Sequence, residues 1–336
     1  MNKKIITSVV LGTAAMTFAA TTAYAAEYKV GIIKFVDDAS LDQIEQAIKD
    51  ELDAASADGE NTYTYDGLVY NGQADGTQLA QVEAQLIADE PDIIIPIATP
   101  AVTTLISALE DSDIPVVFSA VSDPVGAGIV ASLDAPGENV TGTSDALNTN
   151  AIFDLITTAN PEIKKVGLLY SQSEDASTQA IADAKAYLDN AGIEYVEKTG
   201  TNDTEIMQAA AALIDEEVEA VFTPTDNTVM KAELAIYESF AEAGIPHYAG
   251  ADSFALNGAF CGYGVNYANL GTETAKMVIE ILNGADPAST PVKTFDNGIV
   301  TINTEIAEEI GIDYSAFSKS DACSEIVETV TAENFE

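Results

Sequence analysis

The stretch "PDIIIPIATPAVTTLISALEDSDIPVVFSAV", residues 91–121, decides the fold class. Residues 91–98 form an apolar run, residues 99–111 place apolar side chains at helical spacing, and residues 114–121 form a second apolar run. Short apolar strands that alternate with helices are typical of a parallel sheet covered on both faces. This stretch therefore predicts a strand, a helix and a further strand of such a sheet.

The same alternation runs along the chain twice. It begins with a strand at residues 28–36 and a helix at residues 41–55, breaks near residues 139–147, and then restarts. A single hydrophobic core rarely serves a chain of 336 residues. The sequence therefore predicts an α/β protein with two doubly wound parallel-sheet lobes. Ligands of such folds bind beyond the carboxyl ends of the strands, which face each other across a cleft when there are two lobes.

Residues 1–25 are expected to be a cleavable signal peptide. Lys3 and Lys4 precede an uncharged apolar segment, and Ala23 and Ala25 are small residues at the positions that a signal peptidase reads. A membrane anchor is the alternative, but Thr and Gly interrupt the segment and no basic cluster follows it. No Cys lies near Ala25, so a lipid anchor is not expected. The prediction is a protein exported to the periplasm.

The composition excludes some partners. The chain has 55 acidic residues and 13 basic ones, all of them Lys, and a net charge of −42. Such a surface repels nucleic acid and anionic lipid. Without Arg there is no guanidinium clamp for an anion, which must be bound by backbone N–H groups, hydroxyls or Lys.

Cys261 and Cys323 can pair in an oxidising compartment, although the sequence does not fix their separation. With His247 as the sole His, no metal site or cofactor is expected.

Two predicted helix starts offer polar groups to the cleft. Thr99 can cap the helix after the 91–98 strand, with Pro100 as its first residue, so that the N–H groups of Ala101 and Val102 can bind a carboxylate. A capped helix without a ligand is the simpler alternative. At the second start, "VFTPTDNTVM" (221–230), Asp226 is either a helix cap or the partner of an ammonium group.

Asn227 can donate and accept hydrogen bonds beside Asp226. Asp252 lies at the next strand-end position and can share the ammonium group. Two carboxylates favour an amine over a sugar or an acid. Phe35, Tyr170 and Tyr263 are aromatic residues near strand ends. They are either core residues or stack on a flat ligand side chain.

The motifs "SAVSDPVGAG" (119–128) and "PTDNTV" (224–229), with further stretches in order along the chain, carry a family resemblance. The chain resembles ABC-transporter substrate-binding proteins of the tryptophan/tyrosine-binding type, which have the type I periplasmic-binding-protein fold. It departs from them at Asp38-Ala39, where that family usually has His-Pro, and in a carboxyl-terminal extension that carries Cys323.

The resemblance implies a function, a site and a division of the chain. The function is capture of a small amine, most simply an aromatic L-amino acid, for delivery to an ABC permease by a monomer. The implied ligand-binding residues are Ser119, Ala120, Ser122 and Asp123 in the cleft and Ser144 and Asp145 near the hinge, with Asp226 and Asp252 as ammonium partners. The implied division is 1–25 signal peptide, 26–144 plus 266–290 first lobe, 145–265 plus 291–325 second lobe, and 326–336 acidic tail. The lobes are joined by crossings near Thr143–Ala146, Gly264–Tyr267 and Ala288–Lys293. The second crossing returns the chain to the first lobe, and the third returns it to the second lobe.

Two other functions stay open at this point. One is a sensory module that docks on a membrane receptor instead of a permease. The other is an exported enzyme that uses carboxylates. The chain has neither a G-x-G-x-x-G after its first strand nor a G-x-S-x-G motif, so a binding protein rather than an enzyme is expected.

Overall fold

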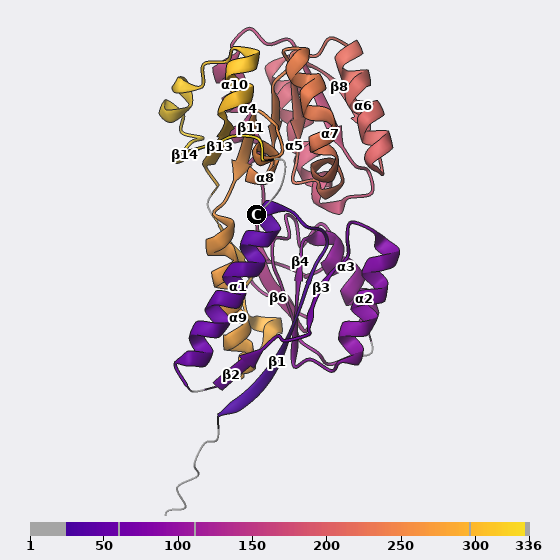
Figure 1. Ribbon diagram of the computed structural model, residues 1–336, viewed down its shortest axis with the longest axis vertical. Helices are drawn as coiled ribbons and strands as arrows, with labels where there is room; N and C mark the ends of the chain where they lie inside the picture. Colours follow the sequence, from indigo (N-terminus) through magenta and orange to yellow (C-terminus); the bar gives the residue numbers. More distant parts are fainter. Residues whose placement is uncertain (1–24, 60, 111, 296, 333–336) are drawn as a thin grey trace, which may run out of the picture.

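The computed structural model describes residues 25–59, 61–110, 112–295 and 297–332, which form two α/β lobes (Figure 1). The expected signal peptide lies outside these residues apart from Ala25. None of the helices in this part of the chain has the length and apolar character that a membrane span needs.

The first lobe is built on a parallel sheet with the strand order β12-β6-β5-β4-β1-β2, in which β3 also pairs with β1. Its strands are β1 (Ala26–Lys34), β2 (Asn61–Thr64), β3 (Val69–Asn71), β4 (Ile93–Ile97), β5 (Val116–Phe118), β6 (Val140–Ser144) and β12 (Lys293–Thr294). Its helices are α1 (Ala39–Ala57), α2 (Gly76–Ala88), α3 (Thr99–Ala108), α9 (Tyr267–Leu282) and the short 3-10 helix η1 (Pro287–Ser289). All five residues of β4 are buried because helices cover both faces of the sheet.

Helix α9 joins the first lobe from far along the sequence. It lies beside α1 (Figure 1). At Gly271 the two helices approach so closely that an added Cβ atom would lie 2.5 Å from the carbonyl oxygen of Ile44. Glycine at this position lets the two backbones meet.

The second lobe has a sheet with the strand order β14-β13-β11-β10-β9-β7-β8. Its strands are β7 (Lys165–Tyr170), β8 (Glu194–Thr199), β9 (Ala220–Thr223), β10 (His247–Ala249), β11 (Cys261–Gly264), β13 (Ile299–Asn303) and β14 (Glu325–Thr329). Its helices are α4 (Thr149–Ala159), α5 (Asp175–Ala191), α6 (Asp203–Asp215), α7 (Asn227–Glu242), α8 (Asp252–Leu256), α10 (Thr304–Ile310) and the 3-10 helix η2 (Ser315–Lys319). Strand β13 is antiparallel to β11 because the chain enters it from the cleft end of the lobe.

The structure moves two of the expected boundaries. Because β12 pairs with β6 of the first sheet, the third crossing follows Thr294 rather than lying within Ala288–Lys293. Strand β14 pairs with β13 along its whole length, so the second lobe extends to Thr329 and residues 326–329 are not a tail. Strands β2 and β3 are separate because the chain turns at Gly67, whose φ is 76°.

The two lobes are closed on each other. One cluster of buried apolar side chains continues from the first sheet, for example Ile33, to Met230 and Phe254 of the second lobe. A separate cluster fills the other side of the second sheet around Phe153 and Phe222. The carboxyl ends of both sets of parallel strands therefore meet at the closed interface between the lobes.

Candidate functional site

A cavity of about 40 Å³ lies between the lobes where the parallel strands end. Residues at the starts of α1, α3, α5, α7 and α8, the segments after β5 and β6, and Tyr267 at the second crossing line it. Asp38, Asp145 and Asp226 are among these residues, and Lys and His are not. A larger groove of about 450 Å³ shares Ser122 and Ala176 with the cavity.

Asp38 caps the start of α1 and faces the cavity. Its Oδ1 accepts hydrogen bonds from the N–H groups of Ser40 (2.8 Å) and Leu41 (3.1 Å). Its Oδ2 is buried and has no hydrogen-bond partner among the described residues. Burial raises the pKa of Asp38 to about 6, and the nearby charge of Asp252 adds to this. The Ser253 hydroxyl and the two backbone N–H groups of α1 oppose the rise. The sequence analysis noted Asp38 only as a departure from the family pattern, and did not place it in the site.

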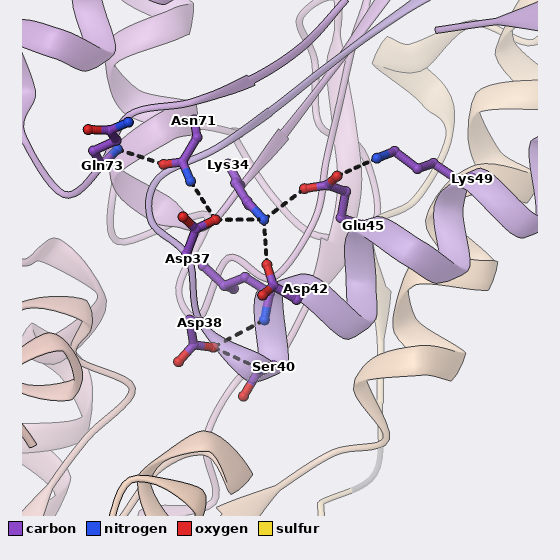
Figure 2. A network of polar contacts seen from close by, with 10 residues as sticks. Lys34, Asp37, Asp38, Ser40, Asp42, Glu45, Lys49, Asn71 and Gln73 are labelled. Atoms are coloured by element: carbon purple, nitrogen blue, oxygen red, sulfur yellow. Dashed lines mark hydrogen bonds and ion pairs between the residues drawn. The ribbon is translucent and has the colours of Figure 1, made fainter. Parts of the chain in front are cut away.

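The loop that carries Asp38 is fixed by a buried lysine. Figure 2 shows the Lys34 ammonium group between the carboxylates of Asp37, Asp42 and Glu45. The Nζ atom lies 3.0 Å from both Asp37 and Glu45, and the Lys34 side chain is only 12% exposed. Burial alone would lower the pKa of Lys34, but these hydrogen bonds raise it above its ordinary value. Lys34 thus offsets part of the negative charge that flanks Asp38 and is not available to the cavity.

The start of α3 differs from the prediction. Thr99 is the first residue of the helix, not its cap, and Ala98 takes the cap position with a φ of 77°. The N–H groups of Ala101 and Val102, which were expected to bind an anion, both donate to the carbonyl oxygen of Ala98, at 3.1 and 3.3 Å. Neither Pro100 nor Ala101 lines the cavity. The Thr99 hydroxyl does face this space, is buried, and has no partner in the described part of the chain.

A second cluster joins the lobes beside the cavity. Ser122 donates to Asp145 Oδ1 over 3.0 Å and lies 2.8 Å from the hydroxyl of Thr225 in the second lobe. Since Ser122 has one proton and gives it to Asp145, Thr225 is the donor across the lobes. Burial raises the pKa of Asp145 to about 6, and the Ser122 hydrogen bond opposes this rise.

Asp226 lines the cavity but its carboxylate is largely occupied. As the cap of α7 it accepts from the Val229 N–H at 3.0 Å. Its other oxygen accepts from the Ser171 N–H and the Ser177 hydroxyl, both at 2.7 Å. Burial raises the pKa of Asp226, and these hydrogen bonds oppose the rise. Asp226 is therefore a helix cap that joins α7 to α5, and this role does not depend on a ligand.

Asn227 and Asp252 are also engaged by protein groups. The N–H and side-chain nitrogen of Asn227 both donate to Glu174, at 2.8 and 3.1 Å. Burial raises the pKa of Glu174 well above its ordinary value, and the Asp226 charge adds to the rise. Both Asp252 oxygens accept from first-lobe side chains, and Asp252 does not line the cavity although Ala251 and Ser253 do.

The remaining predicted site residues do not share one place. Ala120, with a φ of 55°, lines the cavity, whereas Asp123 and Ser144 line the adjoining groove. Ser119 is buried against Thr274, with 2.9 Å between their hydroxyl oxygens.

The three aromatic candidates lie outside the cavity. Phe35 belongs to the apolar core, Tyr263 belongs to the core of the second lobe, and Tyr170 donates to Glu197 away from the cleft. The aromatic residues that do line the cavity are Phe254 and Tyr267. Sequence reasoning missed them, although Tyr267 follows a predicted crossing and Phe254 follows a strand.

The two cysteines are free thiols, so the disulfide that the sequence left open is not formed. Cys261 is buried in β11, and burial raises its pKa above the ordinary value. Cys323 is partly buried, and its pKa is raised for the same reason.

Comparison with known proteins agrees with this arrangement. Residues 29–322 match the family model described as ABC transporter substrate binding protein. A tyrosine-binding protein from Clostridioides difficile (strain R20291) is 30% identical over 298 residues, which cover 87% of this chain and 85% of that protein.

Two similar solved structures differ in whether a ligand is bound. The structure of an ABC domain in complex with L-Trp from Streptococcus pneumonia is 32% identical, has a TM-score of 0.81, and covers 90% of this chain and 100% of its own. The ligand-free, open structure of a substrate binding protein from Clostridium difficile is 30% identical but has a TM-score of 0.67, with coverage of 91% and 100%. At similar identity, the chain is thus closer in shape to the ligand complex than to the open protein. With its two α/β lobes, inter-lobe cavity and family match over most of its length, the chain belongs to the ABC transporter substrate binding protein family.

Proposed function

We propose that this protein captures a small amine-bearing ligand between its lobes, with an aromatic L-amino acid as the first candidate, and delivers it to an ABC permease. The tyrosine-binding relative and the L-Trp complex support an amino acid as ligand. The chain binds this ligand as a monomer, without turning it over, after export to the periplasm and cleavage following Ala25. A membrane receptor in place of the permease remains the second candidate, because both partners would recognise the closed lobes.

The observation that carries the proposal is a set of unpartnered polar atoms on the cavity. Asp38 Oδ2 and Thr99 Oγ1 from the first lobe, and Ser253 Oγ from the second, lack hydrogen-bond partners in the described part of the chain. These residues are 1–3% exposed. A buried polar group without a partner costs roughly 1–3 kcal/mol. A ligand that supplies partners to both lobes removes this cost only when the lobes are closed.

The cavity chemistry assigns the ends of the ligand. An ammonium group fits near Asp38 and Asp145, since both carboxylates have acceptor capacity left, whereas Asp226 already accepts three hydrogen bonds from protein groups. The Thr99 hydroxyl, which has no partner in the described part of the chain, is the donor we assign to the ligand's carboxylate. The cavity of about 40 Å³ is smaller than an aromatic side chain, so we place that side chain toward the groove beyond Ser122 and Ala176.

A thermal-shift panel of the common L-amino acids tests the proposed function on the mature protein. A ligand present at about 100 times its Kd should stabilise the folded state by roughly 2.7 kcal/mol. Aromatic amino acids are expected to give the largest shift, and branched aliphatic ones the next. Native mass spectrometry of the protein as purified should detect a copurified ligand. No shift from any member of the panel would remove the amino acid assignment.

A further inference from the structure

We propose that the cavity prefers ligands with a net positive charge and that Asp38 sets this preference. An amine without a carboxylate should therefore bind more tightly than the matching zwitterionic amino acid. This inference rests on the proposed function of the cavity as the amine site.

The charges around the cavity are of one sign. Asp38, Asp145 and Asp226 line it, Asp252 lies directly behind its wall, and no Lys or His is among the described lining residues. The Lys34 ammonium group on the preceding strand is held by three carboxylates of its own. A zwitterion adds one positive and one further negative charge to this cavity, whereas a simple amine adds only the positive charge. In a space with little water the difference is not screened.

The donors that could hold a carboxylate are mostly in use. The N-termini of α1 and α7 point their first N–H groups at their own caps, Asp38 and Asp226. At α3, the Ala98 carbonyl oxygen takes the N–H groups that would otherwise bind an anion. This leaves the side chains of Thr99 and Ser253 as unpartnered hydroxyl donors on the cavity.

Asp38 is a buried carboxylate with one oxygen left for a ligand on its cavity side. Its Oδ1 is used by the backbone of α1, while its Oδ2 has no partner in the described chain, although the residue is only 3% exposed. Asp145 accepts from Ser122, and Asp226 accepts from three donors. The Ser253 hydroxyl is the protein group that acts on this carboxylate from the second lobe, where it lowers the Asp38 pKa. A ligand cation is a stronger partner for a carboxylate than a neutral hydroxyl.

Titration calorimetry at pH 7 on the mature protein tests this with two matched pairs: L-tyrosine with tyramine, and L-leucine with 3-methylbutylamine. In at least one pair, the amine should bind at least ten times more tightly than the amino acid. Asp38→Asn should weaken the amine about tenfold or more and the amino acid less, so that the ratio shrinks. Asn caps a helix as well as Asp does, so this variant should fold. Asp189→Asn removes the same charge from an exposed position on α5, outside the cavity and the groove, and should leave the ratio unchanged.

The possible failures separate the two proposals. Tighter binding of the amino acid than of its amine would overturn the charge preference and leave the proposed function standing. An unchanged ratio in a folded Asp38→Asn protein would remove Asp38 as the selecting residue. Absence of binding by all four compounds and by the amino acid panel would remove the proposed function and this inference together.

Discussion

Ser40 of the first lobe donates a hydrogen bond of 2.5 Å to Asp252 of the second lobe, across 212 residues of sequence. Gln43, one turn further along α1, donates to the other Asp252 oxygen at 3.0 Å. Asp252 was expected to share the ligand's ammonium group, but both of its oxygens are bound by α1. It is a closing contact between the lobes, and its hydrogen bonds exist only while they are closed.

Removing this contact should favour the open protein. Hydrogen bonds to a charged group contribute roughly 1.5–3 kcal/mol each, and each 1.4 kcal/mol is a tenfold change in an equilibrium. Ser40→Ala combined with Gln43→Ala should therefore increase the radius of gyration in small-angle scattering and raise the ligand Kd about tenfold or more. Gln46→Ala, on the same helix but bonded only to Asp50, is the control. Scattering curves that match the wild type would show that Asp252 does not hold the lobes together.

Asp226→Asn should lower the stability of the fold as well as any ligand affinity. The amide nitrogen cannot accept the Ser171 N–H and Ser177 hydroxyl hydrogen bonds that the second carboxylate oxygen accepts. We expect a loss of roughly 1–3 kcal/mol in urea unfolding. Asp75→Asn is the matched control, because Asp75 is an exposed cap with one hydrogen bond, to Gln78 N–H, that Asn can replace. Equal stabilities of the two variants would contradict this account of Asp226.

Lys34→Met should destabilise the first lobe strongly. Removing one member of a buried ion pair costs roughly 3–5 kcal/mol, because the remaining charges are left unpaired. Here Asp37, Asp42 and Glu45 would repel one another beside Asp38. Lys185→Met removes a more exposed pair with Glu197 and should cost at most about 1 kcal/mol. Guanidinium unfolding of both variants checks this. A similarly small loss of unfolding free energy in both would show that the Lys34 cluster stabilises the fold no more than an exposed ion pair does.

Glu83 should make the fold less stable as the pH rises. It is buried in α2, neither carboxylate oxygen has a partner among the described residues, and burial raises its pKa to about 8. The folded state therefore keeps a proton that the unfolded chain releases near pH 4.5. The stability contributed by this proton is complete below pH 4.5 and is lost as the pH rises through 8.

Two variants of Glu83 separate charge from burial. Glu83→Gln should flatten the pH dependence of unfolding between pH 4.5 and 8. Glu83→Met should also stabilise the protein by roughly 1–3 kcal/mol at pH 8, since it buries no polar group. The exposed Glu110→Gln should change neither quantity. A wild-type protein that gains stability from pH 5 to pH 8, with no difference in the Glu83 variants, would contradict the prediction.

The amino-acid sequence is sufficient to predict the order of most elements, the two lobes and the end of the sheets at which the site lies. The 91–121 stretch predicts a strand, a helix and a strand, and the structure has β4, α3 and β5 within those bounds. These features follow from the spacing of apolar residues, which depends only on near neighbours in the chain. For the same reason the sequence identified the segments after the strands as the polar ones, and Thr99, Ala120, Ser122, Asp145 and Asp226 do line the cavity.

The hydrogen-bond partner of each polar atom, in contrast, depends on how the whole chain folds. Asp226, Asn227 and Asp252 have the residue types of an ammonium site, yet protein donors take up most of their hydrogen-bonding capacity. Asp38 stands out in the sequence only as a departure from the family pattern, yet folding places it on the cavity as the cap of α1. The partner of a buried carboxylate is set by atoms brought within about 3 Å by folding, from residues such as Ser40 and Asp252 that are distant in sequence. No local pattern of residues records that proximity.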